Sequence, residues 1–369
     1  MSSQVGPPWR NLQKLLKGGR DQGVYSAAVA LVGLKGELLW QGVAGRVSRD
    51  PESPPAAPDT IFDLASLTKP LATTLALMLL QARGLLTLKT PLGEVLAASW
   101  LPPDKRPLTL KSLLAHRAGL PAWRPFYETV LAAPEAERPR LLARLAAAEP
   151  LEYTPETATL YSDLGFMLLE AVVEEMSGQG LDAFCRGELY QPLGLNILGF
   201  KPKERLDREE FTWAATDEIS TPGAPAIGEV HDDNARAAGG VAGHAGLFGT
   251  GPEVFALAGW LYRAYNGQSE GLAISPEIVR QYLTPVALGC RTPGFDVPTP
   301  EVSSAGRYFS PGSVGHTGFT GTSFWLDLEL GQMVVLLTNR THLSRDNNAI
   351  KAFRPRFHEA ACRALGIKT

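Results

Sequence analysis

Cysteine is scarce in this 369-residue chain, which has only three: Cys185, Cys290 and Cys362. No two of them form a C-x-x-C pair, the spacing typical of zinc ribbons and thioredoxin-like redox sites, and they are too few and too scattered for a disulfide framework. We therefore expect buried thiols without a metal or redox role.

Long apolar runs are missing as well. No segment offers about 18 uninterrupted apolar residues, the length that crosses a bilayer, and the first 19 residues lack the apolar core of a secretion signal. These absences predict a cytoplasmic protein without a membrane partner.

The sequence has no cluster of residues that carry charge of one sign. The chain has 35 basic and 38 acidic residues, a net charge of −3, and the basic residues form no runs. Without a basic patch there is no electrostatic footprint for nucleic acid. We expect a small-molecule substrate and no nucleic-acid partner, and the sequence leaves the oligomeric state open.

The chain does contain ample apolar sequence, 44% of its residues, which is enough for a large core. Runs rich in β-forming residues predict a hairpin at the N-terminal end and two strands near the C-terminal end. Helical periodicity dominates between them, and a Gly-, Ala- and Pro-rich stretch reads as loops with a short strand. The strands are expected at 24–33, 36–45 and within 322–339; the helices at 9–16, 66–84, 108–120, 136–149, 165–178, 253–267 and 350–366, the last broken near Pro355; the loops at 216–252.

Strands at both ends with helices between them predict an α+β fold, a mainly antiparallel sheet flanked by helices with an inserted all-helical region. On this interpretation residues 1–64 and 235–369 form a discontinuous sheet domain. Residues 65–234 form a mainly helical domain.

The stretch "SLTK", Ser66 to Lys69, is the first motif that can do chemistry, and it is the only Ser-x-x-Lys in the chain. Residues three apart share one face of a helix, so the hydroxyl and the amine can meet. A lysine partly stripped of water can take a proton from a serine and make it a nucleophile. Pro70 places the start of the helix close to Ser66, because proline lacks the N–H of an interior position.

The stretch "YSD" is the second motif. Tyr161 near a cation can lose its proton below its usual pKa and act as a general base, and Asp163, two residues on, can face the same cleft. The third motif is "HTG", His316, Thr317 and Gly318, directly before a β run. A small hydroxyl residue and a glycine let a substrate lie along the strand edge, and a cationic His316 can orient a carboxylate.

The remaining histidines fall into weaker patterns. His231, Asp232, Asp233 and His244 lie close in sequence, but without metal-ligand spacing they are better explained as a loop, so we expect no metal and no cofactor. His231 and Asn234 are candidates for the wall of the substrate cleft.

Taken in order, "SLTK", "YSD" and "HTG" resemble the three motifs of the penicillin-recognising serine hydrolases. The match is closest to the class C β-lactamase and DD-peptidase branch, the β-lactamase-related serine hydrolases. Two further segments, "LTLKSLLAHRAGLP" and "ARAAGGVAGHAGLFGT", are similar to stretches of that family.

The resemblance implies a role for each motif residue. Ser66 is then the acylated nucleophile, Lys69 the proton shuttle, and Tyr161 the general base and acid. His316 and Thr317 hold the substrate, and the backbone N–H groups of Ser66 and Phe319 form the oxyanion hole.

This sequence departs from the family at one position of the second motif. Asp163 stands where an asparagine is usual, so a carboxylate replaces an amide donor and is expected to keep Lys69 charged.

The predicted function is a serine hydrolase that acts through an acyl-enzyme on a β-lactam, a D-amino-acid peptide or another small amide or ester. Two alternatives stay open: a carboxylesterase of the same fold, and a penicillin-binding sensor that is acylated without turnover.

Overall fold

The computed structural model describes residues 6–207, 209–217, 226–286, 291–300 and 303–367. Cys290 and residues 218–225 of the predicted loop stretch lie outside the described residues. Cys185 and Cys362 are buried free thiols, as expected.

The centre of the fold is a five-stranded sheet in the order β2-β1-β7-β6-β5. Every neighbouring pair in it is antiparallel, which confirms the predicted fold class. The strands are β1 (Ala27–Leu34), β2 (Glu37–Gly45), β5 (Val314–Thr317), β6 (Ser323–Leu326) and β7 (Gln332–Thr338). The first strands of the chain therefore pair with the last ones, as their distant positions in the sequence predicted.

The predicted hairpin joins β1 to β2 through the two residues Lys35 and Gly36. Both have positive φ angles, 53° and 85°. Two positive φ values are the requirement of a type I′ turn, whose twist matches that of the two strands.

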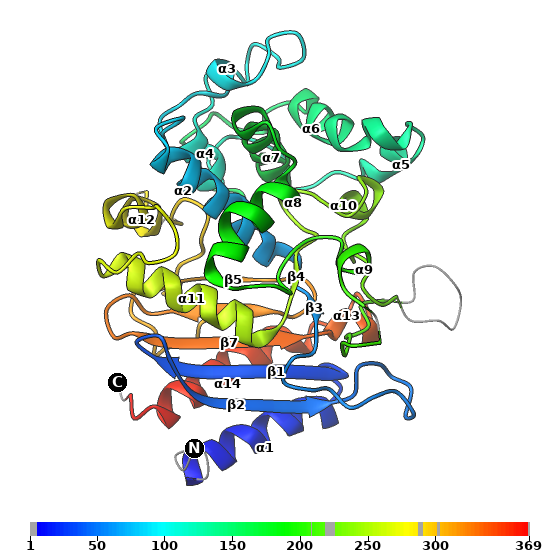
Figure 1. Cartoon of the computed structure of the whole chain (residues 1–369), viewed down its shortest axis with the longest axis vertical. Coiled ribbons are helices and arrows are strands. Elements are labelled where there is room, and N and C mark those ends of the chain that lie inside the picture. Colours follow the sequence, from blue (N-terminus) through cyan, green and yellow to red (C-terminus); the bar gives the residue numbers. More distant parts are fainter. Residues whose placement is uncertain (1–5, 208, 218–225, 287–290, 301–302, 368–369) are drawn as a thin grey trace.

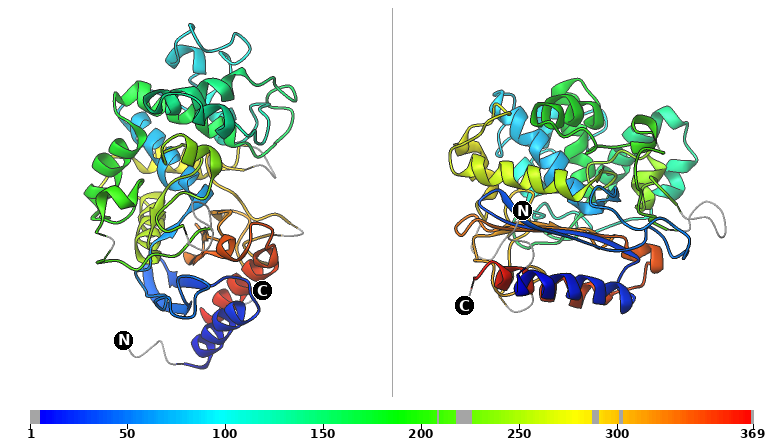
Figure 2. Two further views of the ribbon diagram at one scale, coloured as in Figure 1. Left: turned by 90° about the vertical axis from the view of Figure 1, so that its right-hand side faces the viewer. Right: turned by 60° about the horizontal axis from the view of Figure 1, so that its bottom comes forward.

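Helices cover both faces of the sheet (Figures 1 and 2). Helices α1 (Pro7–Asp21) and α14 (Ala349–Ala364) lie side by side on one face, and α11 (Gly251–Tyr265) lies on the other. Successive residues of β1 alternate between the two cores, with Val29 and Leu31 facing α11, and Ala30 and Val32 facing α1 and α14. Burial on both faces explains why this strand is apolar throughout.

The predicted break near Pro355 is wrong, because α14 runs through the proline from Ala349 to Ala364. Proline removes one backbone hydrogen bond from a helix interior, a loss that tertiary packing can offset. Phe353 precedes the proline and Phe357 follows it, and both are buried in the core beneath the sheet. Packing on both sides thus holds the helix together across Pro355.

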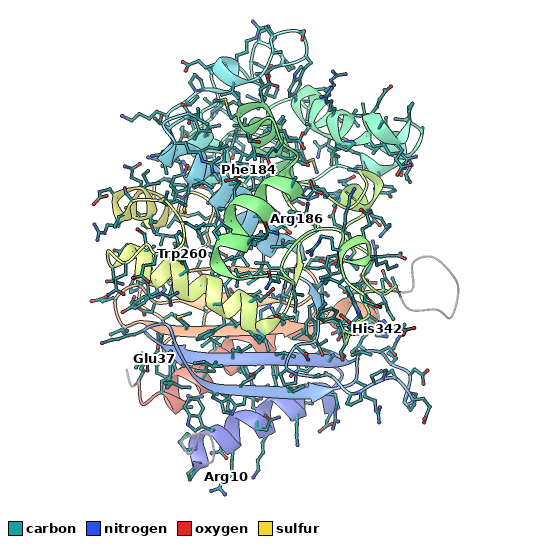
Figure 3. The ribbon with its side chains drawn as sticks, in the orientation of Figure 1. Arg10, Glu37, Phe184, Arg186, Trp260 and His342 are labelled. Carbon is teal, nitrogen blue, oxygen red and sulfur yellow. The ribbon has the colours of Figure 1, made fainter. Side chains whose placement is uncertain are left out.

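Apart from α13, which follows β7 and lies at the end of the large sheet, the remaining elements form a mainly helical region above α11, with a two-stranded sheet at its base (Figure 1). Figure 3 labels Trp260 on α11 and Phe184 on α8, and both are buried in the core that these layers share. The elements are β3 (Phe62–Asp63), α2 (Leu75–Ala82), α3 (Leu92–Val95), α4 (Leu110–Leu114), α5 (Tyr127–Leu131), α6 (Arg138–Ala148), α7 (Asp163–Ser177), α8 (Leu181–Phe184), α9 (Pro202–Arg205), α10 (Asp233–Ala237), β4 (Phe248–Gly249), α12 (Pro276–Leu283) and α13 (Arg340–Leu343).

One apolar core runs from the upper face of the sheet into the helical region without interruption. The boundaries predicted for two domains, at residues 64 and 234, stay a prediction. Within the described ranges no helix is both long and apolar enough to span a bilayer.

Candidate active site

The predicted helix at Ser66 begins with irregular turns. Ala65–Leu67 is a 3₁₀ turn, Lys69–Thr74 is π-helical, and the regular helix α2 starts at Leu75. Ser66 lies in the 3₁₀ turn and Lys69 begins the π-helical turns, and Lys69 Nζ lies 3.1 Å from Ser66 Oγ across this junction. Pro70 sits at the start of the π-helical turns, where its missing N–H costs least.

Lys69 is the most enclosed cation of the site, since its side chain has no exposed surface. Its Nζ donates to Ser66 Oγ at 3.1 Å and to the carbonyl oxygen of His244 at 3.1 Å. It also lies 2.7 Å from Asp163 Oδ1. Although burial lowers it, the charge of Asp163 and the hydrogen bonds to Asp163 and Tyr161 raise the pKa of Lys69 above its ordinary value. The amine is therefore charged in the free protein, as the presence of an aspartate at position 163 predicted.

Tyr161 belongs to the same cluster, and Lys69 Nζ lies 4.9 Å from the centre of its ring. Its hydroxyl makes hydrogen bonds with Ser66 and Lys69. Its ring lies 4.5 Å from the ring of His116 and 5.2 Å from the guanidinium of Arg291. Burial raises the pKa of Tyr161, and the charge of Lys69 only partly opposes this. The expectation of a lowered tyrosine pKa is wrong, because this phenol loses more by desolvation than it gains from the cation.

Helix α7 positions Asp163, which is its first residue. The side chain of Ser162 caps this helix. The backbone N–H of Ser162 donates to His116 Nδ1 at 3.0 Å, which fixes the position of the cap. The N-terminal end of a helix favours a negative charge, so α7 supports a carboxylate at this point. The half-buried carboxylate of Asp163 and the buried amine of Lys69 are thus held in place by different elements, α7 and the turn that contains Ser66.

His316 lies 5.9 Å from Tyr161, ring centre to ring centre, and is almost fully buried. Burial, with the nearby charges of Lys69 and Arg291, lowers the pKa of His316 well below its ordinary value. Its Nδ1 lies 2.9 Å from the carbonyl oxygen of Thr317, to which a neutral ring donates its proton. The expected cationic His316 is therefore corrected to a neutral imidazole.

Thr317 ends β5 and leads into a tight turn at Gly318 and Phe319. A side chain at Gly318 would meet Thr322 Oγ1 at 2.1 Å and the carbonyl oxygen of Leu64 at 2.7 Å, so only glycine fits. Arg354, from α14, donates to the carbonyl oxygens of Gly318 at 2.5 Å and Thr322 at 2.9 Å. A peptide is planar, so the N–H that follows the Gly318 carbonyl points away from Arg354.

Two cavities meet at Ser66, Tyr161 and Phe319. The cationic lobe has a volume of about 390 Å³ and is lined by Arg291, Arg340, Lys351 and Arg354, with Asp296 as its carboxylate. The aromatic lobe has a volume of about 360 Å³ and is lined by Trp123, Phe319, Asp163, His231, Asp232, Asp233 and Arg345. Trp123 and Phe319 are 44% and 53% exposed, which is unusual for large apolar side chains and leaves both rings open to a ligand.

The two weaker candidates from the sequence differ in position. His231 lines the aromatic lobe, and its ring lies 5.4 Å from Phe319. Asn234 does not line either lobe: its side chain accepts the N–H of Tyr127 at 2.8 Å and donates to the carbonyl of Arg124 at 2.9 Å. Both ends of this fully buried amide are used to hold α10 against the chain before α5, so the structure does not bring Asn234 into the cleft.

The loop histidine His244 pairs with Asp232, with 3.0 Å between Nε2 and Oδ1. Asp232 also caps α10 through the N–H of Ala235. In the described part of the chain, no group of three or more His, Cys, Asp or Glu side chains is arranged to hold a metal.

Sequence reasoning missed the two lobes and one carboxylate beneath the nucleophile. Asp63 is buried, and its Oδ1 accepts the N–H of Ala65 at 2.8 Å. A signal existed, since Asp63 is a charged residue inside the otherwise apolar run before Ser66. Arg291, Arg340 and Arg354 come from separate loops and helices, and no local pattern brings them together.

The comparisons with known proteins agree with this geometry. The family model described as Beta-lactamase matches residues 12–354. A putative D-alanyl-D-alanine carboxypeptidase of Escherichia coli O157:H7 is 32% identical over 311 residues, which cover 78% of this chain and 70% of that protein. An N-acetylmuramyl-L-alanine amidase of Bacillus subtilis strain 168 is 32% identical over 307 residues, 77% of this chain and 68% of its own length.

Solved structures show the same fold. EstCE1, a hydrolase with promiscuous acyltransferase activity, superposes with a TM-score of 0.70 at 22% identity, over 94% of this chain and 98% of that one. The antiparallel sheet, the helical region and the family match point to one conclusion: the chain belongs to the Beta-lactamase family.

Proposed function

We propose that the protein is a serine hydrolase that forms an acyl-enzyme at Ser66 with a small amide or ester. One observation carries this proposal. Lys69 Nζ contacts both Ser66 Oγ and Asp163 Oδ1, and Tyr161 completes the cluster where the two lobes meet. A nucleophile, a proton path and a substrate space thus coincide.

The protons follow the hydrogen bonds of the cluster. Ser66 Oγ attacks the substrate carbonyl carbon, and its proton passes to Lys69 as Lys69 gives one to Asp163. Tyr161 then donates its hydroxyl proton to the leaving nitrogen or oxygen as that bond breaks. The proton on Asp163 returns through Lys69 to Tyr161, and water repeats the steps in reverse to release the acyl group.

The negative charge on the attacked oxygen needs two donors. In our proposal the N–H groups of Ser66 and Phe319 take this role. Because Arg354 holds the carbonyl oxygen of Gly318 by a hydrogen bond, the N–H of Phe319 points away from α14.

The preferred substrate is an amide of a short peptide that carries a carboxylate, of the D-amino-acid type. The name of the E. coli relative supports this class. Arg291 and Arg340 in the cationic lobe support it as well, because arginine binds carboxylates in a planar two-bond arrangement. His316 is neutral and does not add charge, so binding of the carboxylate depends on these arginines in our proposal.

A second candidate is an amidase that cleaves next to a sugar. The Bacillus relative carries such a name, and Trp123 with Phe319 could stack on a ring while Asp232 and Asp233 accept its hydroxyl hydrogen bonds. A carboxylesterase and a sensor without turnover remain further alternatives. The cytoplasmic location expected from the sequence would restrict any of these activities to soluble fragments.

Acylation is tested by labelling the purified protein with a fluorescent penicillin and with a fluorescent serine-directed phosphonate, with Ser66→Ala as the control. We expect the wild type to be labelled and Ser66→Ala to stay unlabelled. Equal labelling of both proteins would refute the nucleophile assignment. Loss of the label by hydrolysis indicates turnover, and persistent label indicates a sensor.

Substrate class is tested with four compounds: nitrocefin, a D-alanyl-D-alanine peptide, a muramyl-L-alanyl peptide and a p-nitrophenyl ester. We expect the D-alanyl peptide to be cleaved with the highest kcat/KM. Cleavage of the muramyl compound alone would favour the amidase, and cleavage of the ester alone would favour the esterase.

A further inference from the structure

Asp63, the last residue of β3, is a buried carboxylate that the proton path above does not use. Only 2% of the residue is exposed. Its Oδ1 accepts the N–H of Ala65 at 2.8 Å, and its Oδ2 accepts the N–H of His231 at 2.7 Å. Its carbonyl oxygen accepts a third hydrogen bond, from Thr320 Oγ1 at 2.8 Å.

These three bonds reach three different walls of the cleft. Ala65 is the residue before the nucleophile. His231 lines the aromatic lobe, and Thr320 belongs to the turn that presents Phe319. Through its carboxylate and its backbone carbonyl, Asp63 therefore connects the turn of Ser66, the wall of the aromatic lobe and the turn that carries the Phe319 N–H.

The bond to Ala65 holds an unfavourable backbone conformation. Ala65 has a φ of 49°, in the left-handed region that residues with a Cβ rarely adopt. Such a conformation costs on the order of 1 to 2 kcal/mol and persists only when neighbouring contacts enforce it. The Asp63 carboxylate is one such contact, and Thr68 is another, through its hydroxyl bond to the Ala65 carbonyl at 2.6 Å.

We propose that Asp63 is a positioning residue. Its ionised carboxylate fixes the left-handed turn at Ala65 and thereby the direction of Ser66 Oγ. The same carboxylate holds the backbone of His231 in the wall of the aromatic lobe. This inference rests on the proposed acylation of Ser66 and adds a residue that acts only through Ser66. The carboxylate form is required because both of its partners are N–H donors. A neutral acid or an amide can accept from one of them but turns an O–H or N–H group toward the other.

The electrostatics of the pocket agree with a functional reason for this charge. Burial raises the pKa of Asp63 to about 6, and the nearby Asp232 adds to the rise, while the N–H groups of His231 and Ala65 oppose it. Keeping this buried carboxylate ionised lowers the stability of the folded protein. Residues that are retained despite such a loss are typically needed for function.

The test compares Asp63→Asn with the wild type by the rate of Ser66 labelling from pH 5 to 8. We expect Asp63→Asn to acylate on the order of 10- to 100-fold more slowly at pH 8, since small displacements of a reacting atom have effects of this size. We expect the wild-type rate to fall as the pH drops through about 6, and the Asn variant to lack this acid limb, because it already resembles the protonated form.

A matched control is Asp327→Asn. Asp327 is also fully buried and also accepts backbone N–H bonds, from Ser310, Glu329 and Leu330, but at the far end of β6. We expect this variant to lower the unfolding temperature while the labelling rate of the folded protein and its pH profile stay as in the wild type.

A second variant tests the mechanism directly. Glycine adopts positive φ without strain, so Ala65→Gly added to Asp63→Asn should restore at least part of the lost rate. An unchanged rate and pH profile in folded Asp63→Asn, or no recovery in the double variant, would overturn the proposal. A wild type that is never labelled would instead refute the proposed function itself, which keeps the two failures distinct.

Discussion

At the scale of single residues, the site is a set of buried charges that compensate each other. Lys69 lies fully inside the protein, yet it stays charged because Asp163 Oδ1 is 2.7 Å away. Tyr161 stays neutral because burial outweighs the influence of this cation. The resting cluster therefore holds no neutral amine, and in the proposed path the proton of Ser66 moves to Lys69 as Lys69 passes one on to Asp163.

The first residue-scale prediction concerns Asp163→Asn. An amide accepts no proton and removes the charge that keeps Lys69 protonated, so burial then lowers the pKa of Lys69 and the neutral amine can take the proton of Ser66 directly. We expect the pH profile of acylation to change, with a new acid limb at the lowered pKa of Lys69, below which the rate falls by up to about 10²-fold, the usual range for a general base. Stopped-flow labelling from pH 6 to 10 measures this, and a profile identical to that of the wild type would contradict the proton path.

The second residue-scale prediction concerns stability. The pKa of Asp63 is about 6 in the folded protein against 3.8 for an ordinary aspartate. Between these values the folded protein holds a proton that the unfolded chain has lost, so this group makes stability fall as pH rises from about 4 to about 6. The loss is on the order of 3 kcal/mol at pH 7.

Asp63→Asn lacks this titration. Its free energy of unfolding relative to the wild type should therefore increase between pH 4 and pH 7, which urea unfolding of both proteins at the two pH values can measure. A difference that is independent of pH would show that Asp63 does not titrate in this window.

At the scale of elements, the sequence placed the helix of Ser66 and Lys69 correctly but not its type. The Ser-x-x-Lys spacing and Pro70 predict a helix start, and both are satisfied by a 3₁₀ turn followed by π-helical turns. The irregularity depends on contacts from distant segments, such as Thr73 Oγ1 to the carbonyl of Gly243 at 2.7 Å. Local propensity contains no information on such contacts.

The element-scale prediction concerns the turn at Gly318 and Phe319, which α14 holds through Arg354. In Arg354→Gln the carbonyls of Gly318 and Thr322 lose their charged donor, and the Phe319 N–H is no longer fixed. We expect kcat to fall by up to about 10²-fold, as for loss of an oxyanion donor, with a smaller change in KM. Arg356→Gln on the exposed side of α14 is the control, and an equal effect of both variants would contradict this role.

At the scale of the whole molecule, the fold was predictable, and the arrangement of the site only partly. The continuous apolar, β-forming runs of β1 and β7 and the helical periodicity between them are local signals, so the layered architecture follows from them. The three motifs gave Ser66, Lys69 and Tyr161, which the structure does bring together. The charge state of His316 and the position of Asn234 depend on burial by distant segments, and the sequence alone led to wrong expectations for both.

The last prediction follows from the continuous core between the sheet and the helical region. Leu31 on β1 is fully buried in that core, so Leu31→Ala should cost about 2 to 5 kcal/mol and destabilise both regions together. Urea unfolding followed by circular dichroism and by Ser66 labelling should then give coincident transitions, both shifted to lower urea than in the wild type. Leu330→Ala, at a position 44% exposed, should shift neither by more than about 0.5 kcal/mol. Labelling that is lost well before the circular dichroism signal would show that the helical region unfolds separately, because Ser66 needs both regions in place to react.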